Sequence, residues 1–311
     1  MEELKSLPEK KLYSLCDVFK NAIPELFKRK VIYFDQPLHS NIGDHLILWG
    51  AIEYLRRNHN QILDYFSVAD YSKKKVEKIL SKHPDAVLVM HGGGNFGDLY
   101  SIHQNFRLKI LSDFSTKLTY VFSQSVYYKD SKRAAKDLAN FAKPNVLVLV
   151  RDKESFDLLC SFKVNTKLVP DCAHWLIHNK KFTSKKLTKA RSKKADEQTL
   201  LFRRKDSEST KKLGSGFDWG SLIGIQERLL IKLSRFLLGR KTELLRKFGK
   251  HIYFIYSHRI TNKAIDCFCS YSKIDTDRLH GALLSLLLGL EVVMHDNNNK
   301  KLTRYSATWL R

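Results

Sequence analysis

The feature that most constrains the fold is the alternation of short apolar runs with longer segments of helical spacing over the first 170 residues. Apolar runs this short are typical of strands buried on both faces of a sheet. Strands that alternate with helices favour a mainly parallel sheet, so we predict an α/β fold. After a helical lead-in at 1–29, the predicted strands are 31–34, 62–68, 86–90, 117–123, 146–150 and 164–169, and the predicted helices include 44–57, 72–82, 131–141 and 153–160.

A strongly basic stretch interrupts this alternation. Residues 178–194 contain eight Lys or Arg and no acid, and such a stretch cannot bury a core. We therefore predict an N-terminal domain at 1–177, an exposed basic linker at 178–195 and a C-terminal domain at 196–311. In the C-terminal domain we predict strands at 199–202 and 291–295 and helices at 226–247, 264–270 and 305–310.

The charge balance narrows the choice of partners. The chain has 55 Lys+Arg against 32 Asp+Glu, a formal net charge of +23. Such an excess attracts nucleic acid, anionic lipid headgroups or phosphorylated substrates. Because no zinc-finger, RNP or helix-turn-helix signature is present, we expect no nucleic-acid partner. The 178–194 stretch can be read as a solvated linker or as a segment that contacts an anionic membrane.

Cysteine usage and hydropathy indicate the compartment. Five cysteines without a Cys-x-x-Cys pair argue against both a disulfide framework and a zinc site. The longest apolar run, 283–294, falls short of the roughly 20 residues of a membrane-spanning helix, and the N-terminus lacks the pattern of a secretory signal. We therefore expect a cytoplasmic protein, with peripheral contact at the inner face of the membrane as an added hypothesis.

The densest chemistry lies in the motif Asp275-Thr276-Asp277-Arg278-Leu279-His280-Gly281. It follows a predicted strand and precedes the apolar run 282–288, which predicts a buried helix. Free N–H groups and the helix dipole at such a turn favour an anionic ligand. The simpler interpretation is that Asp277 caps the helix, Arg278 pairs with Asp275 and His280 is a buried histidine.

Three further strand-to-helix junctions carry polar groups. Asn41-Ile42-Gly43-Asp44 precedes one helix, with Asp44 placed to cap it. His91-Gly92-Gly93-Gly94-Asn95 follows a strand and precedes a helix with His103, and its glycines let a backbone approach a ligand closely. Arg151 directly follows the 146–150 strand, where a side chain points into the crevice above a parallel sheet. Ordinary turns, and a salt bridge of Arg151 with Asp152 or Glu154, remain the alternatives.

Taken together, these segments resemble the polysaccharide pyruvyl transferase family. The resemblance is carried by Asn41–Asp44, residues 91–100, Arg151-Asp152, residues 276–281 and the closing Asp296-Asn297 to Trp309. The chain departs from the family pattern at Asn298-Asn299-Lys300, where the family usually has Ser-Tyr-Gly. The resemblance implies two Rossmann-like domains facing each other across a cleft, as in GT-B glycosyltransferases. It also implies transfer of a carboxyvinyl unit from phosphoenolpyruvate to two sugar hydroxyls, giving a cyclic pyruvate ketal and phosphate.

By the family pattern, Arg278 and His280 belong to the donor site, with Arg151 and His103 as partners. Guanidinium groups suit the phosphate and carboxylate of phosphoenolpyruvate, and an imidazole suits proton transfer near neutral pH. We predict His280, Arg278 and His103 as catalytic residues. Substrate contacts are predicted at Arg151, Gly92, Gly93, Gly94, Asn95, Asn41, Asp44 and Asp277. The chemistry needs no metal and no cofactor beyond phosphoenolpyruvate as co-substrate.

The predicted acceptor is a sugar of a bacterial surface or capsular polysaccharide precursor, and a lipid-linked oligosaccharide would explain a basic, membrane-facing surface. Two other functions remain open. One is a GT-B glycosyltransferase that uses a nucleotide sugar. The other is a non-catalytic module that binds polyanions through its positive face.

Overall fold

The computed structural model describes residues 2–179, 198–205, 216–240, 242–296 and 300–311. Its chain separates into two compact units, each assembled from distant parts of the sequence. Unit 1 contains residues 1–16, 38–50 and 173–311, and unit 2 contains residues 17–37 and 51–172. The predicted domain boundaries at 177 and 196 stay a prediction, because a domain is a segment that folds independently, whereas these two units are defined by contacts within the folded chain. Most of the predicted basic linker, 180–195, lies outside the described residues.

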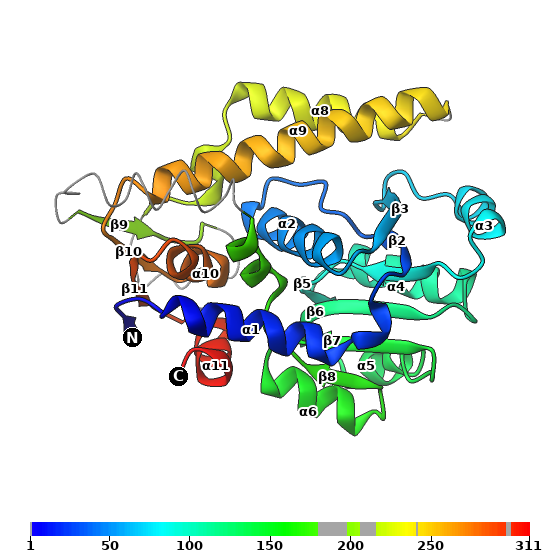
Figure 1. Cartoon of the computed structure of the whole chain (residues 1–311), viewed down its shortest axis with the longest axis horizontal. Coiled ribbons are helices and arrows are strands. Elements are labelled where there is room, and N and C mark those ends of the chain that lie inside the picture. The colour runs from blue at the N-terminus through cyan, green and yellow to red at the C-terminus, as the bar shows by residue number, and fades with distance from the viewer. Residues whose placement is uncertain (1, 180–197, 206–215, 241, 297–299) are drawn as a thin grey trace. The chain divides into compact units, whose positions relative to one another are not determined.

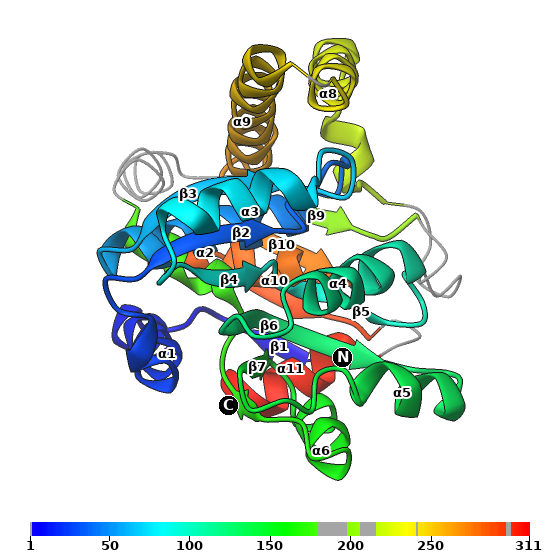
Figure 2. The ribbon, with the colours of Figure 1, turned by 90° about the vertical axis from the view of Figure 1, so that its right-hand side faces the viewer.

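Unit 2 is built on a seven-stranded parallel sheet with the order β3-β2-β4-β6-β7-β8 and with β5 paired to β6 (Figures 1 and 2). The predicted strands are confirmed within a few residues at their ends. The strands are β2 (Lys30–Phe34), β3 (Gln61–Phe66), β4 (Val87–Met90), β5 (Gly93–Gly97), β6 (Thr119–Tyr127), β7 (Val146–Val150) and β8 (Thr166–Leu168). The helices are α1 (Glu9–Ala22), η1 (Pro24–Leu26), α2 (Ile42–Arg57), α3 (Lys73–Lys82), α4 (Ser101–Asp113), α5 (Ser131–Leu138) and α6 (Lys153–Ser161), of which α1 and α2 extend into unit 1.

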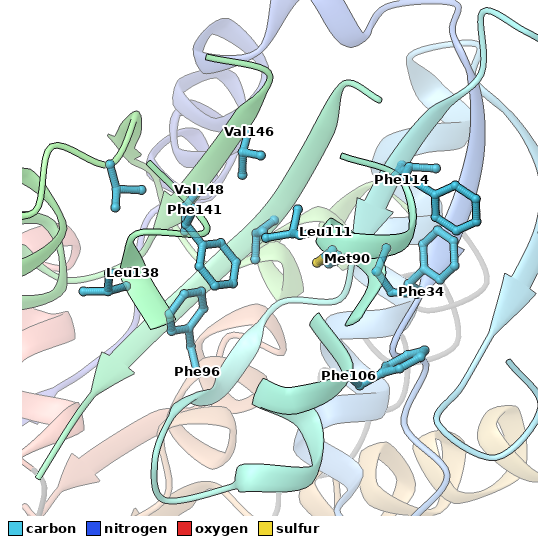
Figure 3. Packing of buried hydrophobic residues seen from close by; sticks show 14 of the residues in the cluster. Phe34, Met90, Phe96, Phe106, Leu111, Phe114, Leu138, Phe141, Val146 and Val148 are labelled. Carbon is cyan, nitrogen blue, oxygen red and sulfur yellow. The ribbon is translucent and has the colours of Figure 1, made fainter. Parts of the chain in front are cut away.

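Both faces of this sheet are covered. Figure 3 shows one face, where Phe34 and Met90 from the strands pack with Phe106 and Phe114 of the α4 segment. On the other face, Phe122 of β6 contacts the rings of Phe19 from α1 and Tyr54 from α2. Burial on both sides explains why the strand sequences are continuous apolar runs rather than alternating ones.

Unit 1 contains a four-stranded sheet with the order β1-β11-β10-β9. The strands β9 (Thr199–Phe202), β10 (Lys273–Thr276) and β11 (Glu291–Met294) are parallel, and β1 (Glu2–Leu4) joins β11 antiparallel. The remaining elements are η2 (Cys172–His178), η4 (Trp219–Leu222), α8 (Ile225–Leu238), α9 (Glu243–Phe268), α10 (Leu279–Leu287) and α11 (Lys301–Trp309). The parallel strands and interleaved helices of both units confirm the predicted α/β class.

The prediction of one helix at 226–247 is wrong. The segment forms two helices, α8 and α9, which lie side by side (Figures 1 and 2). The helical run is interrupted at Gly239, which closes the last turn of α8. The predicted helix at 264–270 is the end of α9. Residues 239–243, Gly-Arg-Lys-Thr-Glu, contain no apolar side chain, and this polar stretch is the sequence signal of the break.

Candidate active site

In unit 2 the order of the strands defines where a ligand would bind. The chain reaches β3 on one side of β2 and β4 on the other, so the order reverses between β2 and β4. Doubly wound sheets bind ligands at the carboxyl end of such a switch point. Asp35 and Gln36 follow β2 and His91 follows β4, and all three are buried there. The side-chain amide of Gln36 makes no hydrogen bond to the described residues.

A buried ionic cluster is centred on Asp35. One carboxylate oxygen lies 2.7 Å from Nδ1 of His103, and the other accepts a hydrogen bond of 3.0 Å from Arg107. Arg107 also donates to the backbone carbonyl of Asn95 at 3.1 Å and to its side chain. The Asp35 carboxylate therefore orients the His103 imidazole, and Arg107 ties this pair to the glycine-rich segment. Sequence reasoning named His103 and Asn95 but missed Asp35 and Arg107.

The segment after β4 forms a strand rather than a plain turn. Residues 93–97 are β5, which runs parallel to the end of β6. Gly93 and Gly97 have φ values of 135° and 119°, which residues with a Cβ rarely adopt. A Cβ on Gly97 would lie 1.8 Å from the carbonyl oxygen of Tyr127. Backbone packing thus explains Gly97, whereas the proposed ligand contacts of Gly92, Gly93 and Gly94 stay predictions.

Arg151 lies buried at the end of β7. Its guanidinium pairs with Asp171 and donates from Nε to Ser125 at 2.9 Å. Asp152 instead caps α6, accepting from the backbone N–H of Ser155 at 2.9 Å. Asp171, twenty residues further along the chain, carries no sequence signal that links it to Arg151.

In unit 1 two of the predicted motifs meet. Asn41 caps α2, since its side chain accepts from Gly43 N–H at 3.2 Å and donates to Asp44 at 2.9 Å. The prediction that Asp44 is the cap is wrong, because α2 begins two residues earlier. A Cβ placed on Gly43 would lie 2.7 Å from Nδ1 of His280, so the start of α2 packs directly on that imidazole. His280 itself is half-buried in the first turn of α10.

The acids and arginine of the 275–281 motif have partners that differ from the simple expectation. Arg278 forms a two-point pair with Asp218, with Nε–Oδ1 at 2.5 Å and Nη2–Oδ2 at 2.7 Å. Asp277 does not cap α10; it accepts the backbone N–H of Arg204 at 2.8 Å. Burial raises the pKa of Asp277, against the lowering effect of that hydrogen bond and of nearby arginines. The Asp218 carboxylate therefore holds the Arg278 guanidinium in place, and Asp277 is bound to the backbone of Arg204.

An ionic cluster in unit 1, in which Arg203 is buried and Asp275 and His295 are half-buried, joins the ends of three parallel strands. Asp275 of β10 lies 2.6 Å from Nη2 of Arg203, which follows β9, and 2.7 Å from Nε2 of His295, which follows β11. Nε and Nη1 of Arg203 are buried and make no hydrogen bond to the described residues. These two N–H groups could receive an anion at the carboxyl edge of the sheet. Arg203 belongs to a basic cluster at the end of the 199–202 strand, but neither it nor His295 is among the predicted site residues; position at a strand end is the signal that could have found them.

Two further kinds of site chemistry concern groups of described residues that could hold a metal ion and the buried Cys172 as a nucleophile. No group of three or more His, Cys, Asp or Glu side chains within them is arranged to hold a metal ion. Burial raises the pKa of the Cys172 thiol and keeps it neutral, which suits a packing residue better than a nucleophile.

The geometry thus gathers the predicted residues into separate groups within each unit. His280 and Gly43 meet in unit 1, and His103 and Asn95 are linked through Asp35 and Arg107 in unit 2. Half-buried imidazoles beside buried carboxylates and arginines near the carboxyl edge of a parallel sheet are typical of ligand sites in α/β enzymes.

The chain belongs to the polysaccharide pyruvyl transferase family, whose sequence pattern matches residues 41–299. The resemblance inferred from the motifs is confirmed, and the family is one of transferase enzymes. The chain is 28% identical to a Bacillus subtilis (strain 168) protein named "Putative pyruvyl transferase EpsO", over 97% of this chain and 90% of that protein. It is 26% identical to "Pyruvyl transferase 1" of Schizosaccharomyces pombe, over 91% of this chain and 70% of that protein.

A solved structure supports the fold. The crystal structure of an uncharacterised Klebsiella pneumoniae protein matches with a TM-score of 0.57 and 20% identity, covering 98% of this chain and 95% of that one.

Within the described residues, no helix combines the length and the hydropathy needed to cross a membrane.

Proposed function

We propose that this protein forms a cyclic pyruvate ketal on a sugar, with phosphoenolpyruvate as donor and phosphate as the second product. The observation that carries the proposal is the packing of His280 against the start of α2, at Gly43, in a chain of this family. That contact places an imidazole beside the N-terminal turns of α2 and α10, where N–H groups and helix dipoles favour an anion. A small, multiply charged enol ester fits this environment.

The reaction needs a proton delivered and a proton removed. C3 of phosphoenolpyruvate takes up a proton while C2 binds the first sugar oxygen, which loses its own proton. The second hydroxyl oxygen then bonds to C2 as the C2–O bond to phosphate breaks, and its proton passes to the departing phosphate, so that the ketal and hydrogen phosphate are released. His280 serves as general acid and base, because an imidazole titrates near neutral pH.

The remaining roles follow from charge and position. His103, held by Asp35, serves as a phosphate contact or second proton carrier. Arg151 and the open N–H groups of Arg203 are candidates for the donor's phosphate and carboxylate. Arg278, held by Asp218, serves as a catalytic cation beside His280. Asn41, Asp44 and residues 92–95 are proposed substrate contacts, and Asp277 is a further contact that orients the turn before α10.

The wider setting is part of the same proposal. The two units would adopt the GT-B-like arrangement of Rossmann-like domains that the family resemblance implies. The acceptor would be a precursor of a bacterial surface or capsular polysaccharide, including a lipid-linked one. The enzyme would act in the cytoplasm, without a metal or cofactor and without a nucleic-acid partner.

Phosphate release tests the proposal directly. Purified protein is incubated with phosphoenolpyruvate and a panel of acceptor glycans, and phosphate and glycan mass are both followed. We expect phosphate to appear only with an accepted glycan, which gains one pyruvyl unit. His280→Ala should abolish turnover, whereas Ser161→Ala, on an exposed helix end, should leave it unchanged.

Ligand binding separates the rival functions. Phosphoenolpyruvate should raise the melting temperature, and nucleotide sugars should not. Stabilisation by a nucleotide sugar alone would favour a GT-B glycosyltransferase. Binding of an acidic polysaccharide that survives the double substitution Arg278→Ala and His280→Ala, without phosphate release from any acceptor, would favour a non-catalytic module.

A further inference from the structure

Helix α8 exposes a continuous apolar stripe along its whole length. Ile225, Leu229, Leu233 and Phe236 recur at helical spacing, and their exposed fractions are 78%, 61%, 45% and 57%. Residues four, four and three positions apart lie on one face of a helix. Large apolar side chains gathered in this way mark a surface that binds something, unlike single exposed ones. We call these four residues the α8 stripe.

The opposite face of α8 is fixed against α9. Ser234 Oγ donates to the carbonyl of Gly249 at 3.0 Å, and a Cβ on Gly249 would lie 2.9 Å from that of Leu237. This close crossing leaves no room for α8 to turn its stripe inward. Figures 1 and 2 show the two helices lying side by side. The exposure of the α8 stripe is therefore built into the packing of the pair.

Charge on α8 is sorted by face. Its basic residues Arg228, Lys232 and Arg235 are exposed and form a row beside the α8 stripe, and the guanidinium of Arg235 also donates to the backbone carbonyl of Leu38 at 2.8 Å. The one acid of α8, Glu227, is buried and lies 2.6 Å from Arg259 and 2.7 Å from Lys263 of α9. Burial would raise the pKa of Glu227, but these hydrogen bonds outweigh it and lower the pKa to about 2. The exposed side of α8 is thus apolar and cationic.

We propose that α8 is a membrane-docking helix that lies in the plane of an anionic bilayer surface. The α8 stripe would enter the boundary between headgroups and acyl chains, and the basic row would contact anionic headgroups. At 14 residues, α8 is about 21 Å long, which suits a helix lying on a membrane rather than across it.

Other occupants fit the surface less well. A second copy of the chain, docked symmetrically, would bring two identical basic rows together in a protein of net charge +23. A nucleic acid would pair with the basic row but leave the apolar stripe exposed to water. An anionic bilayer satisfies both features. The inference concerns where the protein acts and holds whether or not the proposed transfer chemistry is right.

Vesicle co-sedimentation tests the inference, with the full chain and without donor or acceptor. Vesicles of phosphatidylcholine alone are compared with vesicles that contain 30% phosphatidylglycerol, a composition of roughly physiological charge. We expect the chain to bind the anionic vesicles and the double variant Leu229→Gln/Phe236→Gln to bind at least about tenfold more weakly. Arg228→Gln/Lys232→Gln should lose about 30-fold on anionic vesicles and little on neutral ones.

The matched control replaces two exposed apolar side chains elsewhere, Val68→Gln/Leu201→Gln, whose exposed fractions are 44% and 49%. This control should bind like the unchanged chain, and melting curves confirm that every variant is folded. Equal binding by the Leu229→Gln/Phe236→Gln variant would overturn the proposal. Dimerisation through this face would also overturn the proposal. In that case light scattering would show that the Leu229→Gln/Phe236→Gln variant loses the dimer, while its vesicle binding stays unchanged.

Discussion

Gly43→Ala offers a sharp test of the contact between α2 and His280. The new Cβ would lie 2.7 Å from Nδ1 of His280, 3.0 Å from its Cγ and 3.1 Å from its Cβ. Because ordinary contacts begin near 3.4 Å, the imidazole must move by about 0.7 Å, the difference between 3.4 and 2.7 Å. The short distance to Cβ means that rotation of the ring alone cannot relieve the overlap.

The expected effect is on catalysis more than on stability. A displacement approaching 1 Å can lower the rate by about 100-fold, so we expect kcat for phosphate release to fall about 10- to 100-fold. Alanine gains up to about 1 kcal/mol over glycine inside a helix, which offsets part of the strain. The free energy of unfolding, measured in urea, should therefore change by less than about 1 kcal/mol.

The control and the double variant isolate the cause. Gly220→Ala places a Cβ with no atom within 4 Å, so kcat should stay at the level of the unchanged protein. If the overlap with the His280 ring is the cause, then Gly43→Ala should cost less free energy of unfolding in a His280→Ala background, where Nδ1 and Cγ are absent. Full kcat in a folded Gly43→Ala variant would refute the reasoning, since His280 would then need no fixed position.

Four other substitutions test the buried charges and the glycine-rich segment. Asp35→Asn should lower the free energy of unfolding in urea by about 3 kcal/mol, because it removes one partner of a buried pair, whereas Asp157→Asn in an exposed pair should cost under about 0.5 kcal/mol. Gly97→Ala should give little folded protein on size exclusion, because its Cβ would overlap a carbonyl oxygen at 1.8 Å. The folded protein raises the pKa of Asp277, so its charged form opposes folding above that pKa. Asp277→Asn should therefore be neutral or stabilising at pH 7. The difference in free energy of unfolding between this variant and the unchanged protein should differ between pH 7 and pH 4, and an equal difference at both would contradict the reasoning. The folded protein lowers the pKa of Glu227 to about 2, so its contribution to stability is present above its unfolded pKa of 4.5 and is lost as pH falls toward 2. Glu227→Gln should lower the free energy of unfolding by about 1–2 kcal/mol at pH 7, and a loss that does not shrink in acid would contradict this.

The elements of unit 2 could be predicted because local physics decides them. Strands such as β4 and β7 are short apolar runs that only burial on both faces explains, and the helices between them follow from spacing. Unit 1 was harder. Glu2–Leu4 carries no apolar pattern, and it is a strand only because β11, nearly 290 residues away, offers it an edge.

The candidate site shows the same division. Position at strand ends singled out Arg151 and the turn before His280, since the carboxyl edge of a parallel sheet is a general ligand site, and the family pattern added His103. The partners that orient these side chains could not be predicted. Asp218 lies 60 residues from Arg278, and only the folded chain pairs them. Contacts of this separation depend on topology, which local patterns do not encode.

The sheet of unit 1 joins residues 2–4 to residues 291–294, and this sets an order for synthesis. A ribosome that has made residue 172 has already made every strand of unit 2, whereas β10 stays without its β11 neighbour until translation passes residue 294. Protease digestion of arrested nascent chains should therefore find unit 2 protected first. Protection of unit 1 in chains halted before residue 291 would contradict this order. Until then the nascent chain would expose the unpaired backbone edge of β10 to chaperones and to other nascent chains.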